Sequence, residues 1–216
     1  IMEPMTSTWP EPGFLEGVRE VTQRHGIVLV FDEMLTGFRF AAGGAQEYFG
    51  VMPDLAAFGK GLANGFPLSA VVGRRDLMML MQDIFFSGTF GGETLSLAAA
   101  DVVLGRMATG EPTAALARIG AELVEAVDAA RSEASKSLLE FTGHPSWFFL
   151  KWSVADARTL NEVKTLFLQE MLRRGVLVLG THDVTTAFTA DDIALVAAAY
   201  AETLDIIVDG LERGDV

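Results

Sequence analysis

Lys60 stands between Gly59 and Gly61 at the end of an apolar run, an unusual place for a lysine. Residues 55–59 are apolar or small, and they predict a strand covered on both faces, as in a parallel sheet of an α/β protein. In such sheets ligands bind outside the carboxyl ends of the strands, which is where this amine would lie. Burial disfavours the charged form of an amine, and a neutral amine can attack a carbonyl carbon. The position therefore favours covalent chemistry, and a lysine that caps a strand at the surface is the alternative interpretation.

Asp32 and Glu33 end a second apolar run, residues 27–31, which has the β-branched composition of a central parallel strand. Two carboxylates at the end of a buried strand are unfavourable unless a cation pairs with them, so we expect one of them to face the crevice. An exit of the strand into water is the alternative. An acid and an amine at two strand ends are the pair that pyridoxal phosphate requires, because its aldehyde bonds to a lysine and its ring nitrogen keeps a proton only beside a carboxylate.

The composition narrows the class of function. Half of the 216 residues are hydrophobic, enough for a sizeable core, and the formal charge of −13 disfavours binding to nucleic acid or to anionic membranes. There is no cysteine and the three histidines lie far apart in the sequence, so we expect no metal site. No apolar run approaches the ~18 residues of a spanning helix, and the first residues lack the features of a signal peptide, so we expect a cytoplasmic protein. Small-molecule chemistry is the leading class.

The Gly59-Lys60 pair superficially resembles a phosphate-binding loop, but two features argue against nucleotide binding. A Walker loop needs a glycine five residues before that pair and Ser or Thr after it, and the chain has Asp54 and Gly61 there. A dinucleotide fingerprint needs a helix at once, whereas Pro67 and a predicted strand follow.

The remaining pattern predicts two domains, residues 1–109 and 110–216, because an alanine-rich amphipathic pattern begins near residue 110. The glycine-rich loop at residues 85–92 carries Ser87 and Thr89, whose hydroxyls, with the backbone amides, suit an anion such as phosphate; a plain turn is the alternative. We expect helices at residues 14–25, 45–49 and 74–81, from 93, from 110, at 160–172 and from 190, and strands at 68–73, 138–141, 147–154 and 176–178.

Several motifs, in this order and spacing, resemble class III aminotransferases: FDEMLTGFR at residues 31–39, PD at 53–54, FGKG at 58–61 and SGTFGG at 87–92. Within that family the chain is most similar to the glutamate-1-semialdehyde 2,1-aminomutase branch, and it resembles the carboxyl-terminal half. The resemblance implies an α/β fold of the PLP-dependent transferase type, fold type I. Residues 1–109 would then form part of the parallel-rich sheet of the large, PLP-binding domain, and residues 110–216 an α+β small domain.

The resemblance also implies roles for four residues. Lys60 would form the Schiff base with pyridoxal 5'-phosphate, and Asp32 would hold the pyridinium nitrogen. Met34 would occupy the place of the aliphatic residue that packs on the ring face. Thr89 would reach the phosphate bound in the neighbouring subunit, which makes the expected enzyme a homodimer with shared active sites.

Arg39 is expected to bind a substrate carboxylate, and a structural ion pair with Glu33 or Glu47 is the alternative. The glycine-serine phosphate loop and the ring-stacking aromatic residue of the family would precede this sequence. We therefore expect the chain alone to bind pyridoxal phosphate weakly and to expose apolar sheet surface around Val28 and Ala57.

Two departures from the aminomutase branch bear on the reaction. Glu93-Thr94 stands where that branch usually has Asn-Pro, and Phe188 stands where the family often has histidine. Both favour amino transfer between a small-molecule amino donor and a carbonyl acceptor over the aminomutase reaction proper. A non-catalytic, degenerate relative is a further alternative, but the presence of both Lys60 and Asp32 favours an enzyme.

Overall fold

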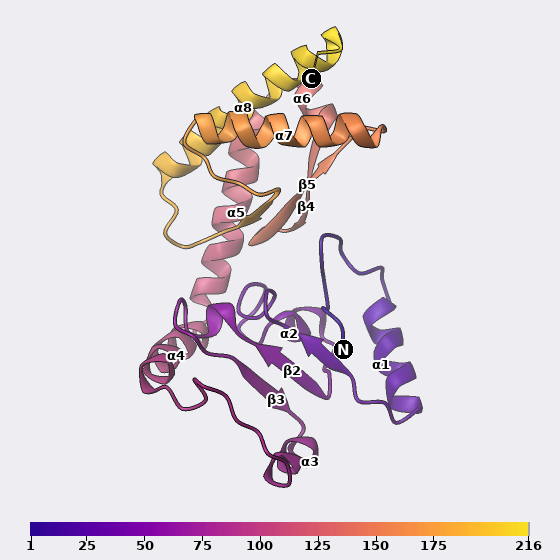
Figure 1. The fold of residues 1–216 in the computed structure, drawn as a ribbon, viewed down its shortest axis with the longest axis vertical. Helices are drawn as coiled ribbons and strands as arrows, with labels where there is room; N and C mark the ends of the chain where they lie inside the picture. The colour runs from indigo at the N-terminus through magenta and orange to yellow at the C-terminus, as the bar shows by residue number, and fades with distance from the viewer. Residues whose placement is uncertain (216) are drawn as a thin grey trace. The chain divides into compact units, whose positions relative to one another are not determined.

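The chain divides into two compact units, Ile1–Ala114 and a second that begins at Ala115 (Figure 1). The structure is a computed structural model that describes residues 1–215. Each unit has its own three-stranded sheet and its own helices, so both are mixed α/β. The division falls within helix α5 (Glu111–Ala130), a few residues after the boundary expected from the change in composition. No helix in residues 1–215 is long and apolar enough to cross a membrane.

The sheet of the first unit has the order β1-β2-β3, in which β1 and β2 run parallel and β3 is antiparallel to β2. Met2 adds a parallel bridge to Phe31 of β1. The segments of this unit are β1 (Val30–Asp32), β2 (Leu55–Phe58), β3 (Ala70–Gly73), α1 (Phe14–Arg24), α2 (Ala45–Phe49), α3 (Arg75–Met78), α4 (Thr94–Met107) and two 3₁₀ turns, η1 (Lys60–Leu62) and η2 (Met79–Gln82).

Strand β1 is shorter than the predicted strand at residues 27–31, and that prediction is wrong at its amino end. The Gly26 backbone is left-handed, with φ of 64°, and the Ile27 amide donates to the Thr22 carbonyl at 2.8 Å. This is the Schellman ending of α1, so Ile27 belongs to the helix cap rather than to the strand. Ile27 and Val28, which precede the strand, are 54% and 41% exposed.

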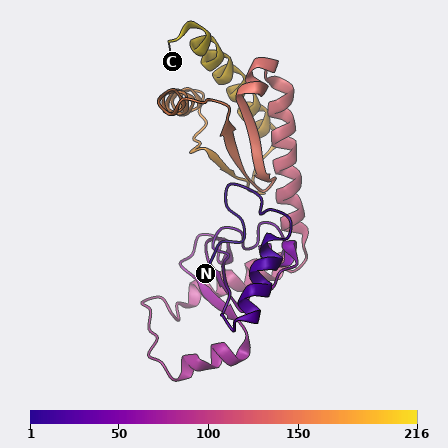
Figure 2. The same cartoon turned by 90° about the vertical axis from the view of Figure 1, so that its right-hand side faces the viewer.

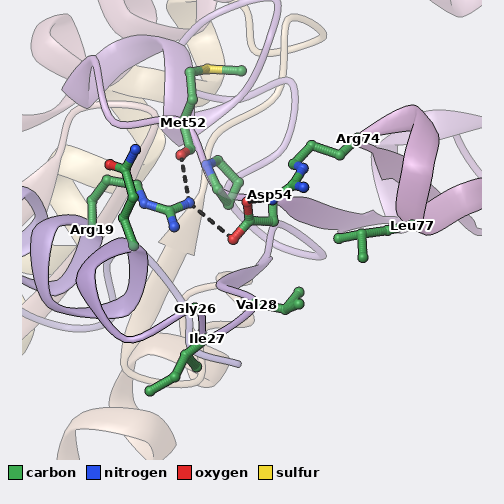
Figure 3. Close-up of a pocket in the computed structure, with 10 residues that line it drawn as sticks. Arg19, Gly26, Ile27, Val28, Met52, Asp54, Arg74 and Leu77 are labelled. Atoms are coloured by element: carbon green, nitrogen blue, oxygen red, sulfur yellow. Dashed lines mark hydrogen bonds and ion pairs between the residues drawn. The ribbon is translucent and has the colours of Figure 1, made fainter.

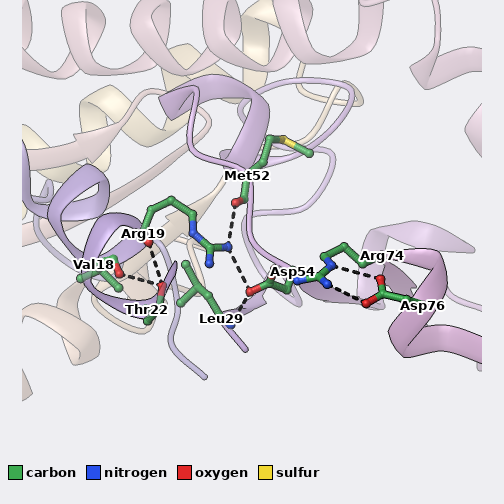
Figure 4. A network of polar contacts seen from close by, with 8 residues as sticks. All are labelled: Val18, Arg19, Thr22, Leu29, Met52, Asp54, Arg74 and Asp76. Atoms are coloured by element: carbon green, nitrogen blue, oxygen red, sulfur yellow. Dashed lines mark hydrogen bonds and ion pairs between the residues drawn. The ribbon is translucent and has the colours of Figure 1, made fainter. Parts of the chain in front are cut away.

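A buried carboxylate, Asp54, ties together the amino ends of the strands (Figure 4). It accepts hydrogen bonds from the Leu29 amide at 2.8 Å, from Arg74 at 2.9 Å and from Arg19 at 3.1 Å. Burial opposes the charge of Asp54, but these three donors outweigh it and hold the pKa of the carboxyl below its usual value. Asp54 therefore links helix α1, the start of β1 and the end of β3.

A pocket lies beside this carboxylate and is lined by Arg19, Met52, Asp54, Arg74 and their neighbours (Figure 3). Its two guanidinium groups are balanced by two carboxylates, because Arg74 also pairs with Asp76 at 2.6 Å. The pocket thus offers no excess positive charge, and we assign it no ligand.

In the second unit, three helices and the part of α5 from Ala115 onward pack around an antiparallel sheet of order β4-β5-β6. Its other segments are β4 (Leu139–His144), β5 (Trp147–Trp152), β6 (Thr181–Asp183), α6 (Glu133–Leu138), α7 (Ala157–Arg173) and α8 (Ala190–Arg213). Helix α8 begins with a capping box, in which the Thr189 side chain accepts from the Asp192 amide and the Asp192 side chain accepts from the Thr189 amide. The core contains Leu123, Val127, Phe148, Val163, Phe167, Met171, Tyr200, Leu204 and Ile207 among others.

The predicted strand at residues 176–178 is wrong, and the third strand of this sheet is β6. Pairing with β5 begins only where the Gly180 carbonyl accepts from the Leu150 amide, at 3.3 Å. Burial alternates along residues 176–179 as in a strand, because Val176 and Val178 are buried and the leucines between and after them are exposed. These residues nevertheless form no strand and connect α7 to β6. Helix α6 was not predicted, although Ser132 caps it through the Ser135 amide.

Two histidines, the buried His144 and the half-buried His182, make the stability of the second unit sensitive to acid. Burial lowers the pKa of both His144 and His182 to about 4. The Ser146 amide donates to His144 Nδ1 at 3.1 Å, so that nitrogen must be an acceptor in the neutral ring. His182 Nε2 lies 2.5 Å from the Tyr200 hydroxyl, which is itself buried. Both rings are therefore held neutral in the folded protein.

We expect the free energy of unfolding of this unit to fall as the pH is lowered from 6.5 toward 4. The unfolded chain binds protons on these histidines in that range and the folded chain does not, so each histidine contributes up to about 3 kcal/mol that is present above pH 6.5 and lost below it. Urea unfolding of the full-length protein at pH 7 and 4.5 measures the loss. The double variant His144→Gln/His182→Gln should flatten the pH dependence, whereas His25→Gln, at an exposed position, should not; an unchanged slope in the double variant would contradict the assignment.

Candidate active site

Asp32 and Lys60 lie at the same edge of the first sheet. Asp32 is the last residue of β1 and pairs in register with Ala57 of β2, while Lys60 follows the end of β2 by two residues. Because β1 and β2 are parallel, both side chains belong to the carboxyl edge of this pair, where α/β sheets bind ligands. Asp32 is half-buried, and its Oδ1 accepts the Met34 amide at 3.0 Å, which orients the carboxylate.

Lys60 is exposed in this chain, so the expected burial of its amine is not observed. The physical reason is the backbone: β2 ends at Phe58, and Lys60 opens the turn η1, which is closed by the Leu62 amide donating to the Gly59 carbonyl at 2.9 Å. Lys60 adopts a left-handed conformation with φ of 43°. For a non-glycine residue this conformation costs about 1–2 kcal/mol, and such strain is found preferentially at functional positions.

The loop that follows β1 packs against the segment that carries Lys60. Met34 fills the space where a side chain at Gly59 would lie, since a Cβ there would come within 2.3 Å of the Met34 Cε. A Cβ at Gly37 would likewise come within 2.6 Å of the Phe58 Cδ1. The centroids of the Phe38 and Phe58 rings lie 5.3 Å apart. Glycine at position 59 is thus required by the packing of Met34.

Glu33, next to Asp32, is turned into the protein and is only 1% exposed. Its carboxylate accepts hydrogen bonds from the Thr36 hydroxyl at 2.5 Å and from the amides of Ala45 and Gln46 at 2.9 and 2.8 Å. These partners are neutral donors, so the expectation that a buried carboxylate here needs a cation is wrong for Glu33. Of the two acids, Asp32 remains at the strand edge, and Glu33 has a structural place that the sequence did not indicate.

Arg39 and Thr89 lie on two different segments of the first unit. Arg39 is half-buried in the loop after β1, and its amide donates to the Thr36 carbonyl at 3.2 Å. Thr89 is exposed on the segment between η2 and α4, which extends from the unit as a long loop (Figure 2). Phe85, Phe86 and Phe90 on this segment are 96%, 75% and 58% exposed. The substrate role of Arg39 and the phosphate role of Thr89 stay predictions.

The segment with Thr89 leads into α4, which contacts the turn η1 that begins at Lys60. Glu93 caps this helix by accepting from the Leu95 and Ser96 amides at 2.8 and 2.6 Å. The pKa of the Glu93 carboxyl is lowered by hydrogen bonds from Ser96 and Leu95. The acid that stands where the aminomutase branch has Asn is therefore explained as a helix cap.

A half-buried carboxylate and a strained lysine thus lie at the carboxyl edge of a parallel strand pair, and a glycine-rich segment leads into the helix beside the lysine turn. The sequence matches the family described as Aminotransferase class-III over residues 1–211. The chain belongs to this family.

Similar sequences and a similar solved structure support membership of this family. The chain is 37% identical to a glutamate-1-semialdehyde 2,1-aminomutase of Syntrophobacter fumaroxidans over 82% of its length and 44% of the relative's. It is 34% identical to a 3-aminobutyryl-CoA aminotransferase of Cloacimonas acidaminovorans over 90% of its length and 48% of the relative's. The structure of the PLP internal aldimine form of the FumI protein of Sphingopyxis sp. MTA144 matches with a TM-score of 0.82 and 26% identity, covering 92% of this chain and 48% of that one.

These likenesses confirm the fold class expected from the sequence, the α/β fold of PLP-dependent transferases. The chain spans about half the length of the relatives that it matches.

Proposed function

We propose that the full-length protein is a pyridoxal-phosphate-dependent aminotransferase, with Lys60 as the residue that bonds the cofactor and Asp32 as the partner of its ring nitrogen. The observation that carries this proposal is the placement of an amine and a carboxylate at the carboxyl edge of two parallel strands in register. Family membership supports it, as does the pyridoxal phosphate named for a structural relative.

The residues at the carboxyl edge of β1 and β2 suit pyridoxal phosphate. Pyridoxal phosphate, when bound, supplies an electron sink for carbanion chemistry at the substrate. The ionised Asp32 carboxylate, held by the Met34 amide, would keep a proton on the nitrogen that faces it. The Lys60 Nζ, exposed and on a short turn, has the freedom to accept a proton and to return it elsewhere on the substrate. Met34 offers an apolar wall beside Gly59, and Arg39 is the proposed donor to a substrate carboxylate.

Borohydride reduction of the pyridoxal-phosphate-loaded protein, followed by peptide mapping, tests the assignment of Lys60. The expected result is a single cofactor label on Lys60. A label on Lys136, Lys151 or Lys164 would overturn it.

Amino transfer between a small-molecule donor and a carbonyl acceptor is favoured over the aminomutase reaction, which returns the amino group to the same molecule. The Glu93-Thr94 and Phe188 departures support this choice. An ¹⁵N-labelled candidate donor, incubated with a separate carbonyl acceptor, distinguishes the two. Label recovered in the second compound supports transfer, and label confined to the original carbon skeleton supports the mutase.

We further infer that the enzyme works as a homodimer in which Thr89 binds the cofactor phosphate of the other subunit. The exposed phenylalanines of the Thr89 segment support an apolar interface there, since exposed aromatic clusters of this kind mark contact surfaces. A phosphate also needs several hydroxyl and amide donors, which Ser87, Thr89 and the glycine-rich backbone can supply.

Mixed dimers of Lys60→Ala and Thr89→Ala subunits are expected to restore one complete site per dimer. Thr89→Ala alone should weaken binding of pyridoxal phosphate about tenfold, through loss of a charged hydrogen bond. In the mixed dimer the only Lys60 lies in the Thr89→Ala subunit, and its partner supplies the intact Thr89. The measurement is the borohydride label on Lys60 against cofactor concentration. Recovery of the wild-type affinity supports sharing between subunits; persistence of the weakened affinity would show that Thr89 acts within its own subunit.

A further inference from the structure

The loop after β1, residues 34–44, is the wall against which the Lys60 segment rests. Met34 lies on Gly59, Gly37 on Phe58, and the Phe38 ring on the Phe58 ring. Whatever holds this loop therefore also holds Phe58 and Gly59, the two residues that lead into Lys60.

The Glu33 carboxylate is a buried polar anchor of this loop. One of its oxygens, Oε2, accepts from the Thr36 hydroxyl at the start of the loop and from the Ala45 amide at the end. The other, Oε1, accepts from the Gln46 amide. The carboxylate thus joins the first turn of the loop to the beginning of α2, with both of its oxygens used.

The surroundings leave this carboxylate little room to move. Gly44, with φ of 83°, lies so close that a Cβ there would be 2.7 Å from the Glu33 Oε2. Thr36 is fully buried, and the Gly37 amide donates to the Glu33 carbonyl at 2.8 Å. Main chain and side chain of Glu33 therefore fix the same loop from two sides.

We propose that Glu33 is a positioning residue for the reaction, acting through the loop at residues 34–44 to hold the strained Lys60 turn. This inference rests on the proposed role of Lys60. Glu33 does not touch the reacting groups; it keeps Met34, Gly37 and Phe38 packed on the segment that presents Lys60. A neutral amide cannot replace it, because the NH₂ group of glutamine would face one of the three donors.

The test compares Glu33→Gln with Asp54→Asn in the full-length protein. Both changes neutralise a buried carboxylate that holds backbone amides of the first unit, and both should lower the temperature of unfolding. Asp54, however, lies at the amino ends of the strands, away from the Lys60 edge. Two readouts are taken well below unfolding: hydrogen exchange of the Leu62 amide, which closes η1, and the dissociation constant of pyridoxal phosphate from its visible absorbance.

Glu33→Gln is expected to speed Leu62 exchange and to weaken cofactor binding, each about tenfold or more, while Asp54→Asn changes neither beyond about twofold. Thr36→Val should act in the same direction as Glu33→Gln, and Thr36→Ser, which keeps the hydroxyl, should stay near wild type. If Glu33→Gln fails to fold, the comparison of Thr36→Val with Thr36→Ser tests the proposal with the same two readouts.

Equal effects of Glu33→Gln and Asp54→Asn, or equal effects of the two Thr36 variants, would overturn the proposal and leave Glu33 as a stability residue. If the wild-type protein binds no pyridoxal phosphate, the proposed function fails. The exchange of Leu62, measured without cofactor, still decides whether Glu33 holds the turn.

Discussion

Replacing Lys60 by alanine is expected to lower the turnover number by at least about 10⁴-fold, because the amine has two tasks, bonding the cofactor and moving the proton. The change should leave the fold intact: the side chain is exposed, and alanine removes only methylene groups and an ammonium from the surface. Alanine adopts the left-handed backbone of position 60 at about the same cost as lysine, so the unfolding temperature should stay close to that of the wild type.

The measurement is the turnover number with the preferred donor and acceptor, together with the temperature of unfolding. Lys164→Ala is the matched control, since it deletes another exposed lysine of the chain. Turnover by Lys60→Ala close to that of the control would contradict the role of Lys60. Loss of turnover with an unchanged unfolding temperature would separate chemistry from folding.

The site elements could be predicted from the sequence because their signals are local. Residues 55–58 are apolar without interruption, and they form the central strand β2 of their sheet. Asp32 ends the neighbouring parallel strand, as its place after an apolar run indicates. Helices α1, α7 and α8 end or begin within one residue of the predicted positions 25, 172 and 190.

The remaining features depend on contacts that no local pattern contains. Glu33 and Asp32 are adjacent in sequence and chemically alike, and only the return of the chain at Ala45 and Gln46 makes Glu33 a buried anchor. The roles of Asp54 and its two arginines arise from residues up to 35 positions apart. The error at residues 176–178 has the same origin, since an alternating apolar pattern predicts a strand whether or not a neighbour offers a ladder.

The exposure of Lys60 can also be explained in physical terms. Apolar sequence before a lysine predicts a buried strand, but the pattern ends at Gly59 and says nothing of the turn beyond it. The turn η1 directs the chain out of the sheet, and the lysine with it. An amine that is exposed in this chain can still be covered by a cofactor, by a substrate or by other parts of the full-length protein.

Replacing Asp32 by asparagine is expected to lower the turnover number by about 10³-fold or more while changing the Michaelis constant far less. Asparagine keeps the oxygen that accepts the Met34 amide at 3.0 Å, so the end of β1 and the loop should retain their structure. What is lost is the negative charge that would stabilise a protonated ring nitrogen, and such a charge matters most in the transition state, where electron density moves onto the ring. Asp54→Asn is the matched control, because it removes a carboxylate from the other end of the same strands and should lower stability rather than turnover. Steady-state kinetics of both variants, with unfolding temperatures measured in parallel, check the expectation. An Asp32→Asn enzyme within about tenfold of the wild-type turnover would mean that another group protonates the ring, and it would remove Asp32 from the site.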